Sequence, residues 1–89
     1  MSLQSASELF LRAILKNEVS RTMMRQYGRA YDAEAHSDSK RALASLRSSV
    51  EGAVANGFDE LKAARPDIAE KADVKWVEGE IVRLILSGF

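Results

Sequence analysis

The sequence contains no cysteine, and it has only one proline and one histidine among its 89 residues. Without cysteine the fold holds no disulfide, and a zinc site would depend on carboxylates, which are poor ligands for structural zinc. We therefore expect no metal and no cofactor. The lack of cysteine also fits a reducing compartment, so the expected location is the cytoplasm.

Long apolar runs are also absent, and the first ten residues lack the basic and apolar regions of a signal peptide. We expect neither a membrane span nor a targeting segment. The length allows a single helical domain, residues 1–89, with a small core. Acidic and basic residues number thirteen each, so the whole-chain charge gives no argument for binding nucleic acid.

The charge is unevenly distributed along the chain. Residues 1–29 carry five basic and two acidic side chains, whereas residues 51–89 carry five basic and eight acidic ones. The two ends are therefore complementary in sign and can attract each other within one chain or between two.

Helical periodicity dominates the remaining pattern. Apolar residues recur every four positions over residues 11–31, which predicts an amphipathic helix. Ser5 and Glu8 match a capping box at its start. Asn17 or Gly28 is the expected place for a bend or break, because both residues lower helix propensity.

A second helix is expected to begin in the segment "SDS", with Ser37 or Ser39 as its N-cap. It should end at Gly57, since glycine readily adopts the left-handed conformation that closes helices. A short third helix over residues 58–65 should then stop before Pro66, because the residue before a proline is pushed out of helical geometry.

The last expected helix covers residues 66–88 and is apolar on more than one face toward its end. A strand is the competing assignment for residues 80–86, because short β-branched runs are ambiguous. Short connections between four helical segments are typical of a compact bundle. The predicted fold is all-α: a small antiparallel helical bundle of about four helices, which dimerisation would complete.

His36 is the candidate for histidine chemistry, and phosphotransfer would require it on an exposed helix face. It precedes three consecutive capping residues, which places it at a helix boundary instead. No cysteine nucleophile or glycine-rich phosphate loop is present. We therefore expect a non-enzymatic protein and assign no catalytic residue, with phosphotransfer as the third interpretation.

Arg21, Arg25 and Arg29 are spaced four residues apart and form one basic ridge on the first helical segment. Such a ridge can follow phosphates, and Tyr27 and Tyr31 could stack on bases. A solvated helix face explains the same spacing. A small nucleic-acid-binding regulator is therefore the alternative function, although the neutral chain argues against nucleic acid as a partner.

The carboxy-terminal segment has more apolar side chains than one short helix can bury against three small neighbours. A shared interface would use the excess, so we predict a homodimer; a monomer with a central last helix is the alternative. The expected interface residues are Trp76, Val77, Ile81, Val82, Ile85, Leu86 and Phe89.

Two adjacent methionines, Met23 and Met24, lie beside Tyr27 and form a soft apolar patch that could adapt to a partner or pack in the core. Together these features favour a small protein–protein interaction or regulatory module, such as an adaptor, an antagonist or an assembly factor. Its expected partners are a second copy of itself and another protein.

Overall fold

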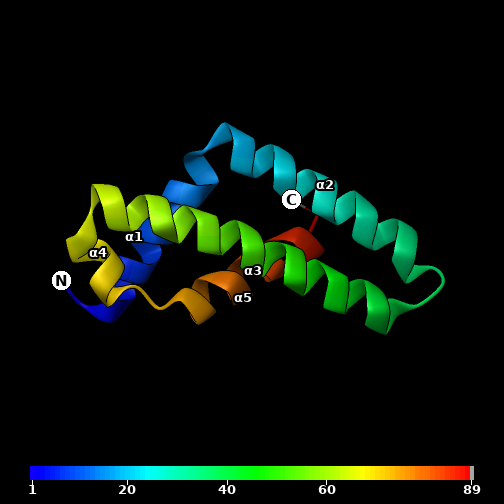
Figure 1. Cartoon of the computed structure of the whole chain (residues 1–89). Coiled ribbons are helices and arrows are strands. Elements are labelled where there is room, and N and C mark those ends of the chain that lie inside the picture. Colours follow the sequence, from blue (N-terminus) through cyan, green and yellow to red (C-terminus); the bar gives the residue numbers. More distant parts are fainter. Residues whose placement is uncertain (89) are drawn as a thin grey trace.

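The structure, a computed structural model, describes residues 1–88 and places them in five helices. In chain order these are α1 (Leu3–Lys16), α2 (Glu18–Ala35), α3 (Ser39–Ala64), α4 (Pro66–Lys71) and α5 (Val74–Leu86), as Figure 1 shows. The described residues contain no strand. The all-α prediction is therefore confirmed, with five helices instead of about four, and residues 80–86 are helical.

α1 begins earlier than the sequence predicts. The side chain of Ser2 caps it, because Ser2 Oγ accepts a hydrogen bond from the backbone N–H of Ser5 at 3.1 Å. Ser5 is therefore inside the helix, and Glu8 accepts a hydrogen bond from Gln4 instead of closing a capping box. The expected capping box was wrong because a serine three residues upstream supplies the same oxygen.

The predicted break at Asn17 is confirmed, and it forms an elbow between α1 and α2. Asn17 ends α1 and caps α2, since its Oδ1 accepts from the backbone N–H of Ser20 at 3.1 Å. Arg21 reaches back across the elbow and donates from Nη1 to the carbonyl of Leu15 at 2.9 Å. The side chains of Asn17 and Arg21 thus bond to a main-chain N–H and a main-chain carbonyl that the helix ends would otherwise leave free. Gly28, the other candidate, lies inside α2.

α3 has 26 residues and is the longest helix, about 39 Å at 1.5 Å per residue. Asp38 caps it by accepting from the backbone N–H of Arg41 at 3.1 Å, so the expected serine caps were wrong. α3 also runs straight through Gly57, where we expected it to end. Gly57 lies against α1, and the Phe58 ring packs on Phe10 with centroids 5.8 Å apart. The part of α3 that continues through Gly57 therefore packs against α1.

The single helix expected over residues 66–88 is divided into α4 and α5. Asp73 caps α5, because its Oδ1 accepts from the backbone N–H of Trp76 at 3.1 Å. The backbone N–H of Asp73 donates in turn to Ser7 Oγ at 2.8 Å, while that hydroxyl donates to the carbonyl of Leu3 at 2.7 Å. This pair of bonds fixes the start of α5 against α1, 66 residues away in the chain.

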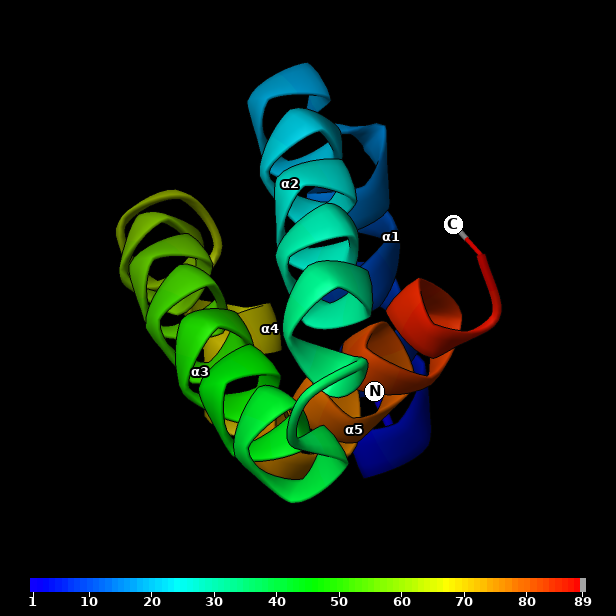
Figure 2. The same ribbon diagram turned by 90° about the vertical axis from the view of Figure 1, so that its right-hand side faces the viewer.

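α5 packs against α1, α2 and α3, while Lys75, Gly79 and Arg83 on its outer side are exposed. Figure 2 shows it beneath the angle between α2 and α3, with α1 on its other side. The buried side chains of the central cluster come from α1, α2, α3 and α5; they are Phe10, Met24, Leu46, Val50, Val54, Val77, Ile81 and Ile85. α2 approaches α5 closely at Gly28, where an added Cβ would lie 3.4 Å from Ile85 Cγ2. The core therefore depends on the helix that comes last in chain order.

Candidate functional site

His36 lies where the sequence analysis places it, at a helix boundary. It follows the last residue of α2 and its side chain is exposed. The loop that contains it is held by the carbonyl of Glu34, which accepts from the backbone N–H groups of Ser37 and Asp38 at 3.0 Å each. The Asp38 cap on Arg41 and a salt bridge of 3.6 Å between Arg41 and Glu34 also span this turn, and His36 takes part in neither.

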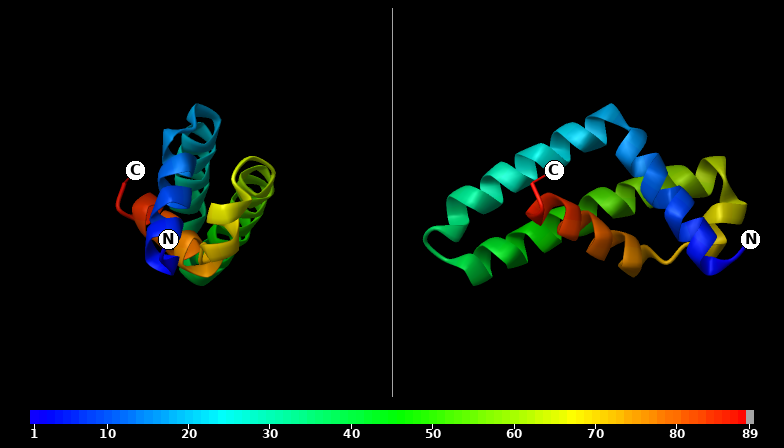
Figure 3. Two further views of the ribbon diagram at one scale, coloured as in Figure 1. Left: turned by 90° about the vertical axis from the view of Figure 1, so that its left-hand side faces the viewer. Right: turned by 180° about the vertical axis from the view of Figure 1, so that it is seen from behind.

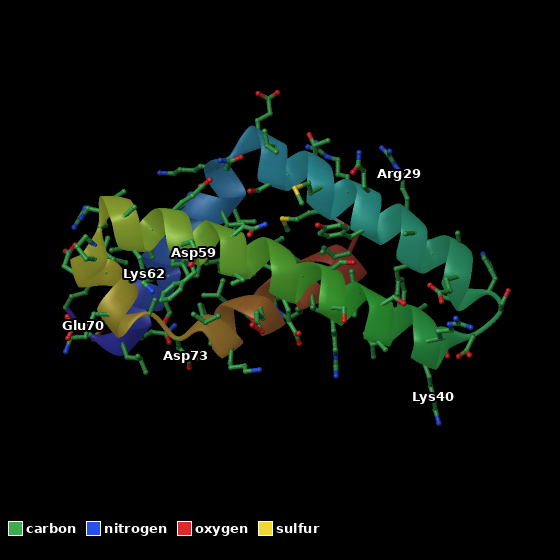
Figure 4. The ribbon with its side chains drawn as sticks, viewed as in Figure 1. Arg29, Lys40, Asp59, Lys62, Glu70 and Asp73 are labelled. Atoms are coloured by element: carbon green, nitrogen blue, oxygen red, sulfur yellow. The ribbon has the colours of Figure 1, made fainter. Side chains whose placement is uncertain are left out.

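The three arginines of the predicted ridge all lie on α2, but they are not equivalent. Arg21 is half-buried and bonded to the carbonyl of Leu15 across the elbow. Arg25 and Arg29 are exposed, and Figure 4 shows Arg29 pointing away from α3. A phosphate would therefore meet two accessible arginines one turn apart, with the third already engaged in the fold.

The predicted interface on the last helix is divided between core and surface. Val77 is completely buried, and Ile81 and Ile85 are 3% and 6% exposed within one chain. Trp76 and Val82 are half-buried, and only Leu86 is substantially exposed, at 46%. Phe89 lies outside the described residues. The dimer stays a prediction, but the side chains at its expected centre already pack in the core of one chain.

A groove lies between the elbow and the carboxy-terminal half of α3. Figure 3 (left) shows how the helices that line it are placed, with α1 and the elbow opposite the end of α3. The groove contains two adjoining hollows of about 270 Å³ each, which share Asn17, Ser20, Gly57 and Glu60. We call this feature the elbow groove.

The first hollow of the elbow groove lies between α1 and α3, and the second lies between α2 and α3. The first is completed by Phe10, Ala13, Ile14, Leu61 and Ala64. The second is completed by Val19, Met23, Ala53 and Asn56. Val19 is 69% exposed, the highest value among the large hydrophobic side chains of residues 1–88.

The methionine patch is divided by the same groove. Met24 is buried at 3% exposure and belongs to the core, whereas Met23 is half-buried and lines the second hollow. The adaptable side chain of methionine suits a surface that must fit a partner. One methionine of the pair thus stabilises the fold and its neighbour faces the groove.

Four of the residues that line the elbow groove are polar: Asn17, Ser20, Asn56 and Glu60. Asn17 Oδ1 is used to cap α2. Glu60 is exposed and, within residues 1–88, forms no salt bridge. It is also the only ionisable side chain lining either hollow in that part of the chain. The groove therefore presents a mixed surface of apolar and neutral polar side chains, with a single negative charge from Glu60.

The ionisable groups with shifted pKa values lie elsewhere, in exposed salt bridges. Arg65 donates two hydrogen bonds to Asp67, at 3.1 Å and 2.9 Å, which lowers the pKa of the Asp67 carboxyl and raises that of the guanidinium. The salt bridge from Arg83 to Glu80 likewise raises the pKa of Arg83. Each of these two salt bridges joins residues two or three positions apart on the protein surface. Neither pair points into a cavity, as catalytic groups do.

Within residues 1–88, no three His, Cys, Asp or Glu side chains gather closely enough to hold a metal ion. None of the five described helices combines the length and apolar character needed to cross a bilayer.

Comparison of the chain with family models, with curated proteins and with solved structures finds no match. The functional argument therefore depends on the geometry of this chain.

The sequence analysis missed the elbow groove. It interpreted Gly57 as the end of a helix and gave Ala13 and Glu60 no role. One signal was present: Ala53 and Gly57 are four residues apart, so they share one face of a continuous helix. Small residues on a shared face allow close approach of another chain, but the signal could be used only once α3 was known to continue.

Proposed function

We propose that this chain is a small non-enzymatic protein–protein interaction module that acts by binding another protein in the elbow groove. The observation that carries the proposal is the position of Val19, which is 69% exposed and lines one of two adjoining hollows that half-buried Ile14, Met23 and Leu61 also line. Solvent-exposed apolar surface at a concave site commonly marks a binding site for another molecule. An adaptor, an antagonist or an assembly factor would each use such a surface.

The chemistry of the groove supports binding rather than catalysis. Its lining is mostly aliphatic and small, and Glu60 is not placed beside a second acid, a base or a nucleophile in the lining. General acid–base or nucleophilic catalysis usually needs at least two such groups within hydrogen-bonding reach. The groove offers shape and apolar contact instead.

Capture of partners from the source cell by chemical cross-linking tests the proposal. Ala13→Arg places a long charged side chain in the first hollow from an exposed position, so it should block binding without disturbing the core. Ala55→Arg is the matched control, because Ala55 is an exposed α3 residue that does not line the groove. Partners should be retained by the control and lost from Ala13→Arg; equal capture by both variants would refute the groove as the binding site.

The alternative function, nucleic-acid binding, is favoured by the exposure of Arg25 and Arg29 on α2. If it is correct, affinity for a duplex or single-stranded probe should fall steeply as salt rises. Replacing both arginines with Gln should flatten that dependence. Lack of probe retardation at physiological salt by micromolar protein would reject this alternative.

The homodimer is a separate proposal about partners, and it rests on the apolar content of α5. Sedimentation equilibrium should show a species heavier than the 9.8 kDa chain. If a dimer forms, Leu86 is the expected α5 contact, because Val77, Ile81 and Ile85 are buried within each chain. A 9.8 kDa species at tens of micromolar would leave α5 as a core helix only.

A further inference from the structure

The main chain around the elbow groove is already bonded, which restricts what can bind there. Helices form its walls, and main-chain groups inside a helix bond to one another. At the elbow, Asn17 caps α2 and Arg21 binds the carbonyl of Leu15. An extended peptide that binds by adding a strand needs an unpaired sheet edge, and the chain has none within residues 1–88. A bound helix satisfies its own main chain and needs only side-chain contacts.

The dimensions of the groove also suit a helix. The α3 residues that line it extend from Ala53 to Ala64, a distance of about 16 Å at 1.5 Å per residue, or about three helical turns. Ala13, Ala53 and Gly57 keep its floor low. Apolar side chains from successive turns of a partner helix can therefore approach the half-buried Ile14, Leu61 and Met23, as in other helix-in-groove complexes; these three also line the two hollows.

Charge at the rim restricts the partner further. Glu60 faces the groove with no basic side chain among the lining residues and no salt bridge within residues 1–88. Its neighbours one turn away on α3, Asn56 and Ala64, are uncharged. A lysine or arginine on a partner helix could lay its aliphatic stem along the apolar wall and place its charge beside Glu60. An acidic residue at that point would be repelled.

A second copy of this chain is a poor source for such a helix. The apolar faces of its helices supply the central core, and its exposed large hydrophobic side chains are scattered: Met1, Leu3, Leu9, Val19 and Leu86. Met1 and Leu3 lie at one end of the described chain and Leu86 at the other, so they do not share a helix. The occupant must therefore bring an apolar helical face that is free before binding.

We propose that the elbow groove binds an amphipathic helix of a partner protein, about three turns long, that carries a lysine or arginine beside Glu60. This inference rests on the proposed function and specifies its partner. The partner helix would have apolar residues three and four positions apart and a basic residue at the edge of that apolar face.

Three synthetic helical peptides test the inference. Each has 14 residues, a side-chain staple that holds the helix, and the same apolar face of leucine and alanine; they differ only in one flanking residue, which is lysine, glutamine or glutamate. Titration into ¹⁵N-labelled protein should shift the amide signals of Ala13, Ala53 and Gly57. Affinity should follow the order lysine, glutamine, glutamate, with about three- to fivefold between the extremes at low salt, as expected for one exposed charge pair.

Variants at Glu60 determine whether that order comes from the proposed contact. Glu60→Gln should remove the preference, and Glu60→Lys should reverse it in favour of the glutamate peptide. Glu51→Gln is the matched control, because Glu51 is an exposed carboxylate on α3 that does not line the groove. The control should keep the original order.

Three other outcomes would overturn the inference. Equal affinity of the three peptides at the groove would refute the basic partner while leaving the groove a protein-binding site. No shift of the groove signals with any peptide would refute the helical occupant, and the cross-linking experiment with Ala13→Arg would still judge the proposed function independently. Groove signals that move with protein concentration alone would identify a second copy as the occupant.

Discussion

α5 and the elbow between α1 and α2 both carry apolar side chains, but they use them in opposite ways. α5 packs against α1, α2 and α3 with the face that carries Val77, which is completely buried. At the elbow the chain turns at Asn17, and Val19 projects beside α3 with 69% of its surface exposed. The more apolar region is therefore hidden, and the less apolar one presents a surface to a partner.

The difference comes from the neighbours of each region. α5 meets other helices on several sides, which accounts for apolar residues on more than one of its faces. The elbow separates α1 from much of α3, and the space between them is not filled by the side chains of this chain. Apolar content therefore shows that a segment needs contacts, and the arrangement of neighbouring helices determines whether the same chain provides them.

The largest expected effect tests whether α5 is core and the elbow is surface. Ile81→Ala removes a buried side chain and should lower the free energy of unfolding by about 2–5 kcal/mol. Val19→Ala removes an exposed one and should change it by less than about 0.5 kcal/mol. Urea denaturation of both variants measures the difference. Equal losses would show that the elbow is as tightly packed in solution as α5.

The second test concerns the bond that fixes the start of α5. Ser7→Ala leaves the backbone N–H of Asp73 without its partner and should cost about 1–3 kcal/mol. Ser48→Ala, at an exposed position on α3, is the control and should be nearly neutral. If the two alanine variants melt alike, water replaces the Ser7 hydroxyl and the position of α5 depends on packing alone.

A smaller effect is expected at the elbow itself. Arg21→Gln removes the guanidinium that binds the carbonyl of Leu15 and should cost about 1 kcal/mol, because the bond is charge-assisted but only partly buried. Arg25→Gln loses an exposed side chain and should cost less than about 0.5 kcal/mol. Thermal unfolding compares the matched pair. A cost for Arg25 equal to that for Arg21 would show that the bond does not hold the elbow.

The smallest expected effect is a gain in stability at the groove floor. Gly57→Ala should stabilise α3 by about 0.5–1 kcal/mol, because glycine is unfavourable inside a helix. The new Cβ would meet Phe10 and Ile14 at ordinary distances of 3.6 Å and 3.7 Å. Gly28→Ala should gain less, since its Cβ would lie 3.4 Å from an Ile85 methyl group in the filled core. If thermal melts show a larger gain in stability for Gly28→Ala than for Gly57→Ala, then the site at Gly57 is packed more tightly than the site at Gly28, contrary to this expectation.

Local signals predicted much of the helical structure. Periodicity predicted the all-α fold, and low helix propensity gave two candidate places for a break, Asn17 and Gly28, of which Asn17 forms the elbow. Choices between similar signals were less predictable. Three adjacent residues could each cap α3, and Asp38 does so. Gly57 could end a helix or lie within one. It lies within α3, where it contacts α1.

The candidate site could not be predicted in the same way. Its lining comes from α1, α2 and α3, and the angle of the elbow that brings these residues together has no counterpart in a hydrophobic pattern. The apolar excess of α5 was visible in the sequence, but periodicity alone does not distinguish contacts within a chain from contacts between chains. Structure was needed to show that Ile81 and Ile85 pack inside the molecule.

The central position of α5 also sets an order in time. A ribosome completes α1 to α4 before α5, so Met24, Val50 and Val54 lack part of their core contacts until residues 77–85 have emerged. The early chain can form helices but cannot complete its core, because stable packing waits for distant contacts. During that interval its apolar faces are open to chaperones and to neighbouring nascent chains. Emergence of α5 is therefore required before the central cluster can close.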